Sequence, residues 1–195
     1  MAGQLIYVVG PSGSGKDSII QALAEQTEVT VMRRVITREP DSIGEDADSV
    51  DIETFDQMEA EGKFSMSWRA NGLSYGIPLS LDEHLQTGQV VVVNGSRKYC
   101  ETLNDRYPDA LVVLVTVDPS LLRQRLQQRN RETSLEIEHR LQRNALFEQT
   151  LLSNFSQWQL RFFMLDNSGE LTQTIEQFHK KLAFHLRIPK TAHMG

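Results

Sequence analysis

The sequence predicts an α/β protein built on a mostly parallel sheet with helices on both faces. Apolar runs rich in β-branched residues alternate with helical patterns along the 195 residues, which is typical of parallel strands joined by helices. The first of these runs ends at a glycine-rich loop that opens a helix. The stretch from about 36 to 88 breaks the alternation with a hairpin and short helices. We therefore expect one domain over residues 1–195, with a five-stranded core sheet and a small insertion.

The first half of the chain supplies two of the expected core strands and the insertion. The run from Leu5 to Val9 is short, apolar and β-branched, as a buried strand should be. Asn71-Gly72 marks a tight hairpin turn, because both residues tolerate positive φ. The expected elements are a helix over 18–26, one strand over 29–36, an acidic loop over 37–51, a helix over 52–61, hairpin strands over 64–68 and 73–75, and a helix over 79–87.

The second half repeats the alternation of strands and helices without an insertion. Asp118-Pro119 opens one of its helices, and we expect Asp118 to cap it. The expected strands cover 89–93, 110–117 and 160–165, and the expected helices cover 96–107, 118–129, 134–153 and 171–186.

Composition excludes several classes of protein. The net charge is −6, whereas a nucleic-acid-binding protein usually has a basic surplus. Cys100 is the only cysteine, so no intrachain disulfide can form, and we expect a small helix residue there rather than a nucleophile. The chain shows neither a signal peptide nor an apolar run long enough to span a membrane. We expect a soluble cytoplasmic protein that binds neither nucleic acid nor membrane.

The glycine-rich loop predicts a site for the phosphates of ATP. Its residues are Gly10, Pro11, Ser12, Gly13, Ser14, Gly15, Lys16, Asp17 and Ser18, which match G-x-x-x-x-G-K between a strand and a helix. The glycines allow consecutive N–H groups to point at phosphate oxygens, and the helix adds its positive N-terminal end. Lys16 would reach the β and γ phosphates as a point charge.

One position departs from this motif. The residue after the lysine is normally Ser or Thr, whose hydroxyl binds Mg²⁺, but here it is Asp17, followed by Ser18. We expect Asp17 or Ser18 to be the protein's ligand for Mg²⁺, which prefers hard oxygen atoms. The alternative is that Asp17 only caps the helix, where a carboxylate is favourable.

Arginines gather in three places away from the loop. Arg33 and Arg34 lie at the end of the strand expected over 29–36, Arg38 lies at the start of the loop after it, and Arg97 follows another strand. Further arginines lie between 123 and 143, where we expect a lid over about 125–143 that closes on ATP. The alternative for the lid arginines is a solvated helix face paired with Glu132, Glu136 and Glu138. Tyr75 could donate to an acceptor phosphate or be a half-buried aromatic residue.

These motifs occur in the order seen in guanylate kinases, and the similarity covers nearly the whole chain. The resemblance rests on the loop, Thr37-Arg-Glu-Pro40, Gly44-Glu45 and Tyr75-Gly76. It implies a P-loop kinase core, an acceptor-binding insertion over about 36–88, and a lid with Arg129 and Arg140. Several guanine-reading groups are missing, most clearly a glutamate whose place is taken by Met66. A site without these hydrogen-bonding groups should not select guanine.

Within the same superfamily, the chain most resembles ribose 1,5-bisphosphate phosphokinases. The matching segments are 10–18, 36–38, 44–46, 70–76, 93–97, 129–132 and 166–169. The resemblance implies transfer of a phosphoryl group from ATP to ribose 1,5-bisphosphate, giving 5-phospho-α-D-ribose 1-diphosphate in bacterial phosphonate catabolism. It further implies Mg²⁺ as a cofactor, a monomer or homodimer, catalysis by Lys16, Arg129 and Arg140, and substrate binding by Arg34, Arg38, Tyr75 and Arg97.

Three alternatives have distinguishing features. A nucleoside monophosphate kinase acting on GMP should retain the base-reading set. A non-catalytic protein-binding module of the guanylate-kinase type should have lost the phosphate loop, which is complete here. A small-sugar kinase, such as a gluconate kinase, should lack Thr37-Arg38 together with Tyr75-Gly76.

Overall fold

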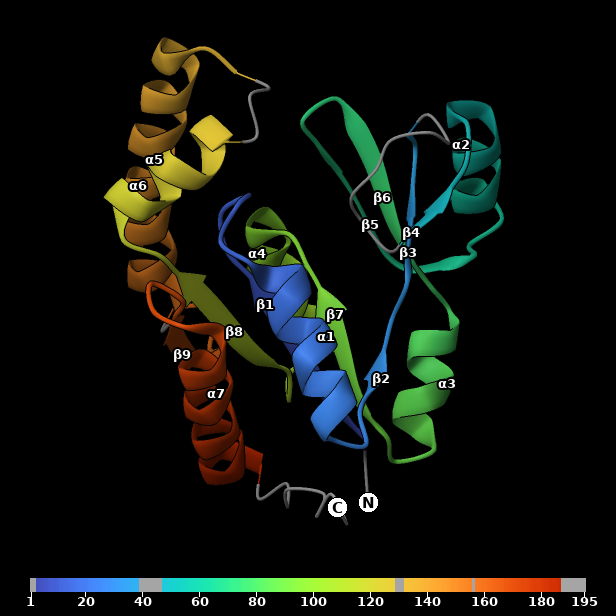
Figure 1. Cartoon of the computed structure of the whole chain (residues 1–195). Coiled ribbons are helices and arrows are strands. Elements are labelled where there is room, and N and C mark those ends of the chain that lie inside the picture. The colour runs from blue at the N-terminus through green and yellow to red at the C-terminus, as the bar shows by residue number, and fades with distance from the viewer. Residues whose placement is uncertain (1–2, 39–46, 129–131, 156, 187–195) are drawn as a thin grey trace.

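The computed structural model describes residues 3–38, 47–128, 132–155 and 157–186, and its core is a parallel five-stranded sheet (Figure 1). The strands lie in the order β2-β7-β1-β8-β9, so β1 is central and pairs with β7 and β8. Their bounds are β1 Gln4–Val9, β2 Thr30–Val31, β7 Val90–Asn94, β8 Leu111–Thr116 and β9 Arg161–Asp166. Because the strands are parallel, all of their carboxyl ends meet at one edge, where ligands bind in such sheets.

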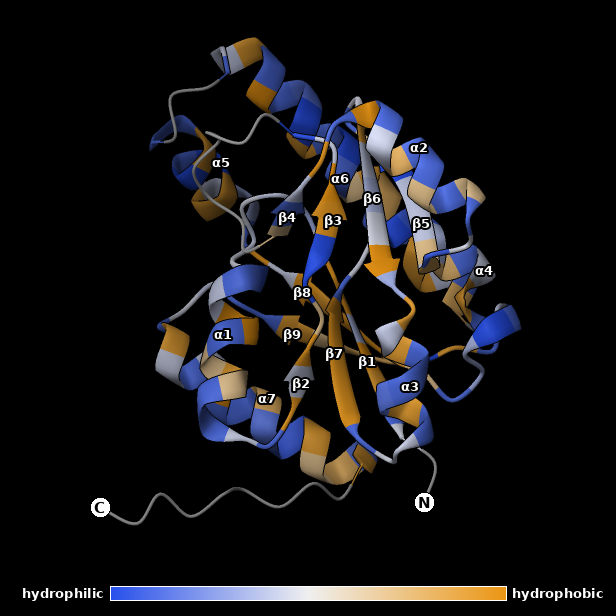
Figure 2. Ribbon diagram, turned by 90° about the vertical axis from the view of Figure 1, so that its right-hand side faces the viewer, coloured by the Kyte–Doolittle hydropathy of each residue, from blue (hydrophilic) through white to orange (hydrophobic). Residues whose placement is uncertain are grey.

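Helices cover both faces of this sheet, as expected. On one face, α1 (Lys16–Gln26) and α7 (Leu171–Leu186) pack their apolar residues against alternate residues of the strands. On the other face lie α3 (Ser80–Gln86), α4 (Cys100–Arg106) and α6 (Ser134–Phe155). Figure 2 shows the core strands as hydrophobic ribbons between helices with hydrophilic outer faces. Burial on both faces explains why the strands read as nearly continuous apolar runs.

The insertion forms a second, mixed sheet in the order β4-β3-β6-β5. Its strands are β3 Arg34–Ile36, β4 Ala47–Ser49, β5 Phe64–Ala70 and β6 Leu73–Pro78, and α2 (Ile52–Ala60) packs against them. The expected hairpin is confirmed, since Asn71 and Gly72 have φ of 52° and 75°. Phe55 of α2 stacks on Phe64 with ring centroids 4.8 Å apart, which fixes the helix on the sheet.

The expectation of one strand over 29–36 is wrong, because the chain changes sheets within it. β2 pairs with β7 in the core, whereas β3 pairs with β4 and β6 in the insertion. Between them, Met32 is buried and donates its N–H to the carbonyl of Val92 at 2.9 Å. Arg33 is half-exposed and ion-pairs with Asp48 at 3.0 Å. An apolar run reports burial, but it does not report which sheet provides the partner strand.

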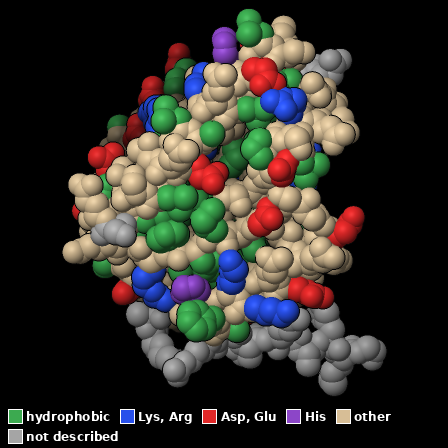
Figure 3. Space-filling model, turned by 90° about the vertical axis from the view of Figure 1, so that its left-hand side faces the viewer, with side chains coloured by type: hydrophobic (Ala, Val, Ile, Leu, Met, Phe, Trp, Pro, Cys, Tyr) green, Lys and Arg blue, Asp and Glu red, His purple; other side chains and the backbone are tan. Residues whose placement is uncertain are grey.

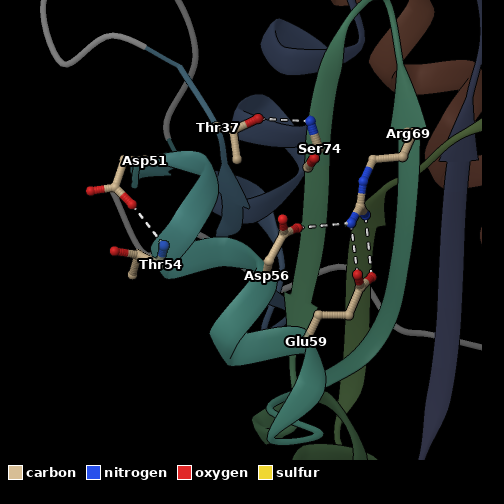
Figure 4. A network of polar contacts seen from close by, with 7 residues as sticks. All are labelled: Thr37, Asp51, Thr54, Asp56, Glu59, Arg69 and Ser74. Atoms are coloured by element: carbon tan, nitrogen blue, oxygen red, sulfur yellow. Dashed lines mark hydrogen bonds and ion pairs between the residues drawn. The ribbon is translucent and has the colours of Figure 1, made fainter.

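Polar contacts anchor α2 and β3 to the hairpin (Figure 4). The Arg69 guanidinium on β5 donates to Glu59 at 2.6 Å and to Asp56 at 3.3 Å, both on α2. The hydroxyl of Thr37 accepts from the N–H of Ser74 at 2.8 Å. This bond joins the end of β3 to the start of β6, so the residues that follow Thr37 leave the sheet from a fixed point.

The stretch expected to be a lid begins with α5 (Pro119–Gln128) and continues into α6. Asp118 caps α5 as expected, accepting from the N–H of Ser120 at 2.8 Å, and these bonds lower the pKa of its carboxyl. Arg123 donates to both carboxylate oxygens of Glu138, at 2.6 and 2.8 Å. For Arg123 the alternative of a paired helix face is therefore the correct one. Figure 1 places α5 and α6 on one side of the phosphate loop and the insertion on the other.

Helix α3 and the end of helix α4 meet at a carboxylate. Asp82 of α3 accepts from the Ser65 hydroxyl at 2.8 Å, from Arg106 at 2.6 Å and from the Tyr107 hydroxyl at 2.7 Å. Ser65 belongs to β5, so the contact ties the insertion to the core. Cys100 is fully buried in α4, and burial raises the pKa of its thiol to about 12. This agrees with the expectation that Cys100 is not a nucleophile.

The surface beside α6, β9 and α7 carries apolar side chains among charged ones (Figure 3). The large exposed hydrophobic residues of these three elements are Leu135, Leu146, Met164, Leu171 and Phe184, with Phe184 83% exposed. β9 is an edge strand of the core sheet. Among the described residues, no helix has the length and apolar content needed to cross a bilayer.

Replacing Asp82 should destabilise the protein. The Asp82→Ala variant removes the acceptor of the Tyr107 hydroxyl, the shorter of the two bonds of the Ser65 hydroxyl and the partner of Arg106, and each lost bond costs about 1 kcal/mol. We expect the free energy of unfolding to fall by about 2–3 kcal/mol in urea titrations. The matched control is Asp105→Asn, at an exposed position on α4, which should change stability little. Equal stabilities of the two variants would contradict the assignment of Asp82 as the link.

Candidate active site

The glycine loop connects the end of β1 to the start of α1. Gly13 and Gly15 have φ of 91° and 86°, a left-handed region that side chains disfavour. A Cβ at Gly15 would also lie 2.4 Å from the Nδ2 atom of Asn167. Gly15 is therefore required both by the backbone conformation and by the close approach of the loop after β9.

Lys16 lies over the loop that precedes it. Its ammonium donates to the carbonyls of Gly10 and Pro11, both at 2.9 Å. The side chain is half-buried, so the charge is held beside the loop rather than extended into water. A phosphate bound on the loop would offer stronger, charge-assisted acceptors for the same ammonium.

Asn167, the residue after β9, holds the loop by a hydrogen bond. Its Nδ2 donates to the carbonyl of Ser14 at 2.7 Å, and its Oδ1 accepts from the Thr174 hydroxyl at 3.0 Å. Arg125 of α5 donates to the Asn167 carbonyl at 3.1 Å. The sequence places Asn167 in a segment of family resemblance and Arg125 in the expected lid, without predicting that either supports the loop. Only the fold brings Asn167 to a loop residue 153 positions earlier in the chain.

A cavity of about 410 Å³ opens beside the loop. Its lining combines loop glycines with polar groups of α1, α5 and the turn after β9, namely Gly13, Gly15, Ser18, Arg125, Gln128, Asn167, Gly169 and Leu171. The Nη1 atom of Arg125 is buried without a hydrogen-bond partner in the described structure. The cavity has the size and the polar groups of a small-ligand site.

The turn after β7 brings a second set of residues to the same edge of the sheet. The Tyr7 hydroxyl accepts from the N–H of Ser96 at 2.8 Å and donates to the Ser96 carbonyl at 3.2 Å. A Cβ at Gly95 would lie 2.0 Å from the Tyr7 ring, so only glycine fits there. β1 thus supports the glycine loop at its end and, through Tyr7, the turn that carries Arg97.

Asp17 contacts this turn. Its Oδ1 accepts from Nδ2 of Asn94, the last residue of β7, at 2.6 Å. Asp17 makes no capping hydrogen bond, because Gly15 is the N-cap and no side chain bonds there, but its carboxylate lies in the first turn of α1, where a negative charge is favourable. Ser18 is exposed and lines the cavity. Of the two expected metal ligands, one therefore faces the turn after β7 and the other faces the cavity.

Arg34 and Tyr75 lie together between the two sheets. Arg34 is only 8% exposed, donates to the carbonyl of Asn94 at 3.3 Å, and lies 5.8 Å from the centre of the Tyr75 ring. Tyr75 is buried and stacks on Trp68 with centroids 5.6 Å apart and planes within 3°. Met66, which replaces a guanine-reading group, is 2% exposed in an apolar cluster. We call Arg34, Tyr75 and Trp68 the acceptor wall; these described residues present a cation and aromatic rings.

Arg97 is held from the long helix α6. It donates to the Oδ1 atom of Asn144 at 2.9 Å and lies 4.6 Å from the centre of the Phe147 ring. Within the described residues it forms no ion pair, and desolvation by burial lowers its pKa. The charge of Glu148 opposes part of this change in pKa. The side chains that contact Arg97 directly, Asn144 and Phe147, are neutral. A half-buried cation of this kind attracts anions. Asn144, which the sequence did not single out, is the residue that positions it.

The other expected site residues have different surroundings. Arg140 ion-pairs with Glu132 at 2.7 Å, so it would have to leave that partner to contact a ligand. Arg38 is half-buried just beyond the end of β3. Arg129 and the residues 39–46 lie outside the described residues.

In the part of the chain that the structure describes, no group of three or more His, Cys, Asp or Glu residues could hold a metal ion. Any cation at Asp17 or Ser18 would take its remaining ligands from phosphate and water, which is how Mg²⁺ commonly binds with nucleotides.

Comparisons with known proteins find sequence relatives and a similar fold over most of the chain. A family model of the AAA domain matches residues 6–144. "Ribose 1,5-bisphosphate phosphokinase PhnN" of Pseudomonas fluorescens is 50% identical over 181 residues, covering 91% of this chain and 93% of the relative. The protein of the same name from Pseudomonas paraeruginosa is 51% identical over 178 residues, covering 90% and 92%. The guanylate kinase of Anaplasma phagocytophilum has a similar fold, with a TM-score of 0.70 at 16% identity over 98% of this chain and 91% of that one.

Removing the Asn167 side chain should weaken nucleotide binding. Asn167→Ala loses the bond that fixes the Ser14 carbonyl, worth about 1 kcal/mol, so the Kd should rise about five- to tenfold. Isothermal titration with a non-hydrolysable ATP analogue measures this change. Asn104→Ala, on α4, is the matched control and should bind as the unmodified protein does. An Asn167→Ala affinity within twofold of the control contradicts the role assigned to this contact.

Proposed function

We propose a function on the basis of this chain's family. The chain belongs to the ribose 1,5-bisphosphate phosphokinases, and the AAA-domain family model matches its residues 6–144. It is an ATP-dependent kinase with a phosphate loop. The reaction we propose is phosphorylation of ribose 1,5-bisphosphate to 5-phospho-α-D-ribose 1-diphosphate, with ADP as the second product, in phosphonate catabolism. The single observation that supports the substrate is the buried Arg34 and the half-buried Arg97 near the end of β7, together with Met66 where the resemblance places a guanine-reading group.

The acceptor wall supports a doubly phosphorylated sugar. Each phosphate carries about −1.5 to −2 charges at neutral pH, so two of them need several positive partners. Arg34 on β3 is buried and donates to the carbonyl of Asn94 at the end of β7, and Arg97, three residues further along the chain, is half-buried. Arginine suits this because its planar guanidinium pairs with phosphate through two N–H groups. The buried Met66 offers nothing to read a base, and this substrate has none.

The mechanism we propose needs no general base. An oxygen of the acceptor's 1-phosphate, already ionised, attacks the γ-phosphorus of ATP. The bond from that phosphorus to the β–γ bridging oxygen breaks, and the electron pair leaves with ADP. Lys16 and the loop N–H groups hold the β and γ phosphates, while Arg38 and Tyr75 bind the acceptor beside Arg34. Arg129 and Arg140 neutralise the transferring group once Arg140 leaves Glu132.

Mg²⁺ fits the residues beside the loop. Asp17 and Ser18 supply hard oxygen atoms, and the Oδ1 atom of Asn94 next to them is buried without a partner in the described structure. When bound, the ion would neutralise charge between the β and γ phosphates. We further propose a cytoplasmic monomer or homodimer in which residues 36–88 bind the acceptor and 125–143 close as a lid.

The purified protein should prefer ribose 1,5-bisphosphate to GMP. With ATP and Mg²⁺, we expect kcat/KM for the sugar bisphosphate to exceed that for GMP by at least about a thousandfold, because lost base contacts discriminate strongly. Release of ADP in a coupled assay gives both values. A higher kcat/KM for GMP overturns the proposed substrate and favours a nucleoside monophosphate kinase.

Replacing Lys16 should abolish turnover without unfolding the protein. Lys16→Ala removes the cation beside the γ-phosphate, and we expect kcat to fall by about a thousandfold or more while the thermal transition moves little. Lys63→Ala, at an exposed position near the start of β5, is the control and should retain full activity. Near-normal turnover by Lys16→Ala would show that the loop does not carry the reaction.

A further inference from the structure

Asp17 and Asn94 differ from the residues usual at their positions. Asp17 carries a carboxylate where a hydroxyl is usual, and Asn94 carries an amide where a carboxylate is usual. In P-loop nucleotide enzymes, a Ser or Thr follows the loop lysine, and an Asp from a strand assists in holding Mg²⁺. Here Asp17 follows Lys16, and Asn94 ends β7, which pairs directly with β1. The carboxylate has therefore moved from a strand end to the first turn of α1, and a neutral amide stands at the end of β7.

The hydrogen bond between the two residues fixes the orientation of both side chains. A carboxylate can only accept, so the Asn94 amide must present its NH₂ group to Asp17, as it does at 2.6 Å. The Oδ1 atom of Asn94 then points elsewhere. Asn94 is 8% exposed, and Oδ1 is buried with no partner in the described part of the chain. A buried acceptor without a donor is unfavourable, so this atom is poised for a donor that arrives with a ligand.

We infer that Asp17 and Asn94 act as one unit that holds the hydrated divalent cation of the donor nucleotide. Asp17 supplies the negative charge. Asn94 is the positioning residue, because its hydrogen bond keeps the exposed side chain of Asp17 in one orientation. Mg²⁺ retains several of its waters in nucleotide sites, and those waters donate hydrogen bonds. The free Oδ1 of Asn94 and the remaining lone pairs of Asp17 are acceptors of the kind such waters need.

The unit also lies next to the acceptor wall. The backbone carbonyl of Asn94 accepts from Arg34 at 3.3 Å, while its side chain contacts Asp17 on the phosphate-loop helix. One residue thus contacts both the helix that would hold the donor and an arginine that would bind the acceptor. This placement relates the position of the cation to that of the second substrate.

The inference rests on the proposed function only because it assumes that the phosphoryl donor is a metal–nucleotide complex. Its test therefore does not need the sugar substrate. Affinity for a non-hydrolysable ATP analogue is measured by isothermal titration in Mg²⁺ and in EDTA, and the ratio gives the enhancement due to the metal. The variants are Asp17→Asn, Asn94→Ala and the exchange Asp17→Asn with Asn94→Asp. Asp105→Asn, exposed on α4, is the control for loss of one negative charge.

We expect Mg²⁺ to tighten binding at least tenfold in the unmodified protein and in the control. Each single variant should lose at least fivefold of this enhancement, whereas affinity in EDTA should not weaken. The exchange variant, which restores one carboxylate and one amide, should recover most of it. A merely structural role would weaken binding equally with and without metal, and it would not be rescued.

Three results overturn the inference. The first is that both single variants keep the full Mg²⁺ enhancement of affinity, and the second is that Asn94→Ala alone keeps it. The third is that the enhancement in the exchange variant is no larger than in Asp17→Asn. Should Asn94→Ala fail to fold, the exchange variant decides by itself. The outcome is separate from the substrate, because a protein that leaves ribose 1,5-bisphosphate unchanged could still show the full metal enhancement. That result would contradict the proposed function alone.

Discussion

The hydrogen bonds between Tyr7 and Ser96 are the contact on which both halves of the site depend. Tyr7 lies in β1, the strand whose end begins the phosphate loop, and its hydroxyl bonds both the N–H and the carbonyl of Ser96. The ring passes so close to Gly95 that no side chain fits at that position. One central strand therefore sets the place of the phosphate loop and of the turn after β7, from which Asn94 and Arg97 project. The geometry between donor and acceptor groups follows from that shared support.

Electrostatics explain how an acidic chain can bind three or more phosphates. The net charge of −6 disfavours anions at long range, so the attraction must be local. Lys16 is held against loop carbonyls, Arg34 is buried beside Asn94, and Arg97 is half-buried against an amide and a ring. Cations with reduced hydration bind phosphate more strongly than exposed ones. Arg123 and Arg140 are ion-paired with Glu138 and Glu132.

The sequence predicted most of the fold, because buried parallel strands and capped helices leave clear local patterns. The phosphate loop, the hairpin at Asn71-Gly72 and the Asp118 cap are examples, and all three are confirmed. The strand over 29–36 was mispredicted because pairing partners are not encoded locally. Asn167, Asn144 and the bond from Asn94 to Asp17 were missed for a related reason. Single asparagines carry no pattern, and their contacts span 153, 47 and 77 residues of sequence.

The central claim is that the protein transfers a phosphoryl group from ATP, bound at the glycine loop, to a phosphorylated sugar that carries no nucleobase. The most direct measurement offers the protein ATP, Mg²⁺ and equal amounts of ribose 1,5-bisphosphate and GMP, and follows the products by ³¹P NMR. The account predicts a new pair of coupled phosphorus signals from a diphosphate on carbon 1 of ribose, with ADP formed in equal amount and GMP unchanged. Phosphorus signals of GDP, with the sugar bisphosphate unchanged, would contradict it.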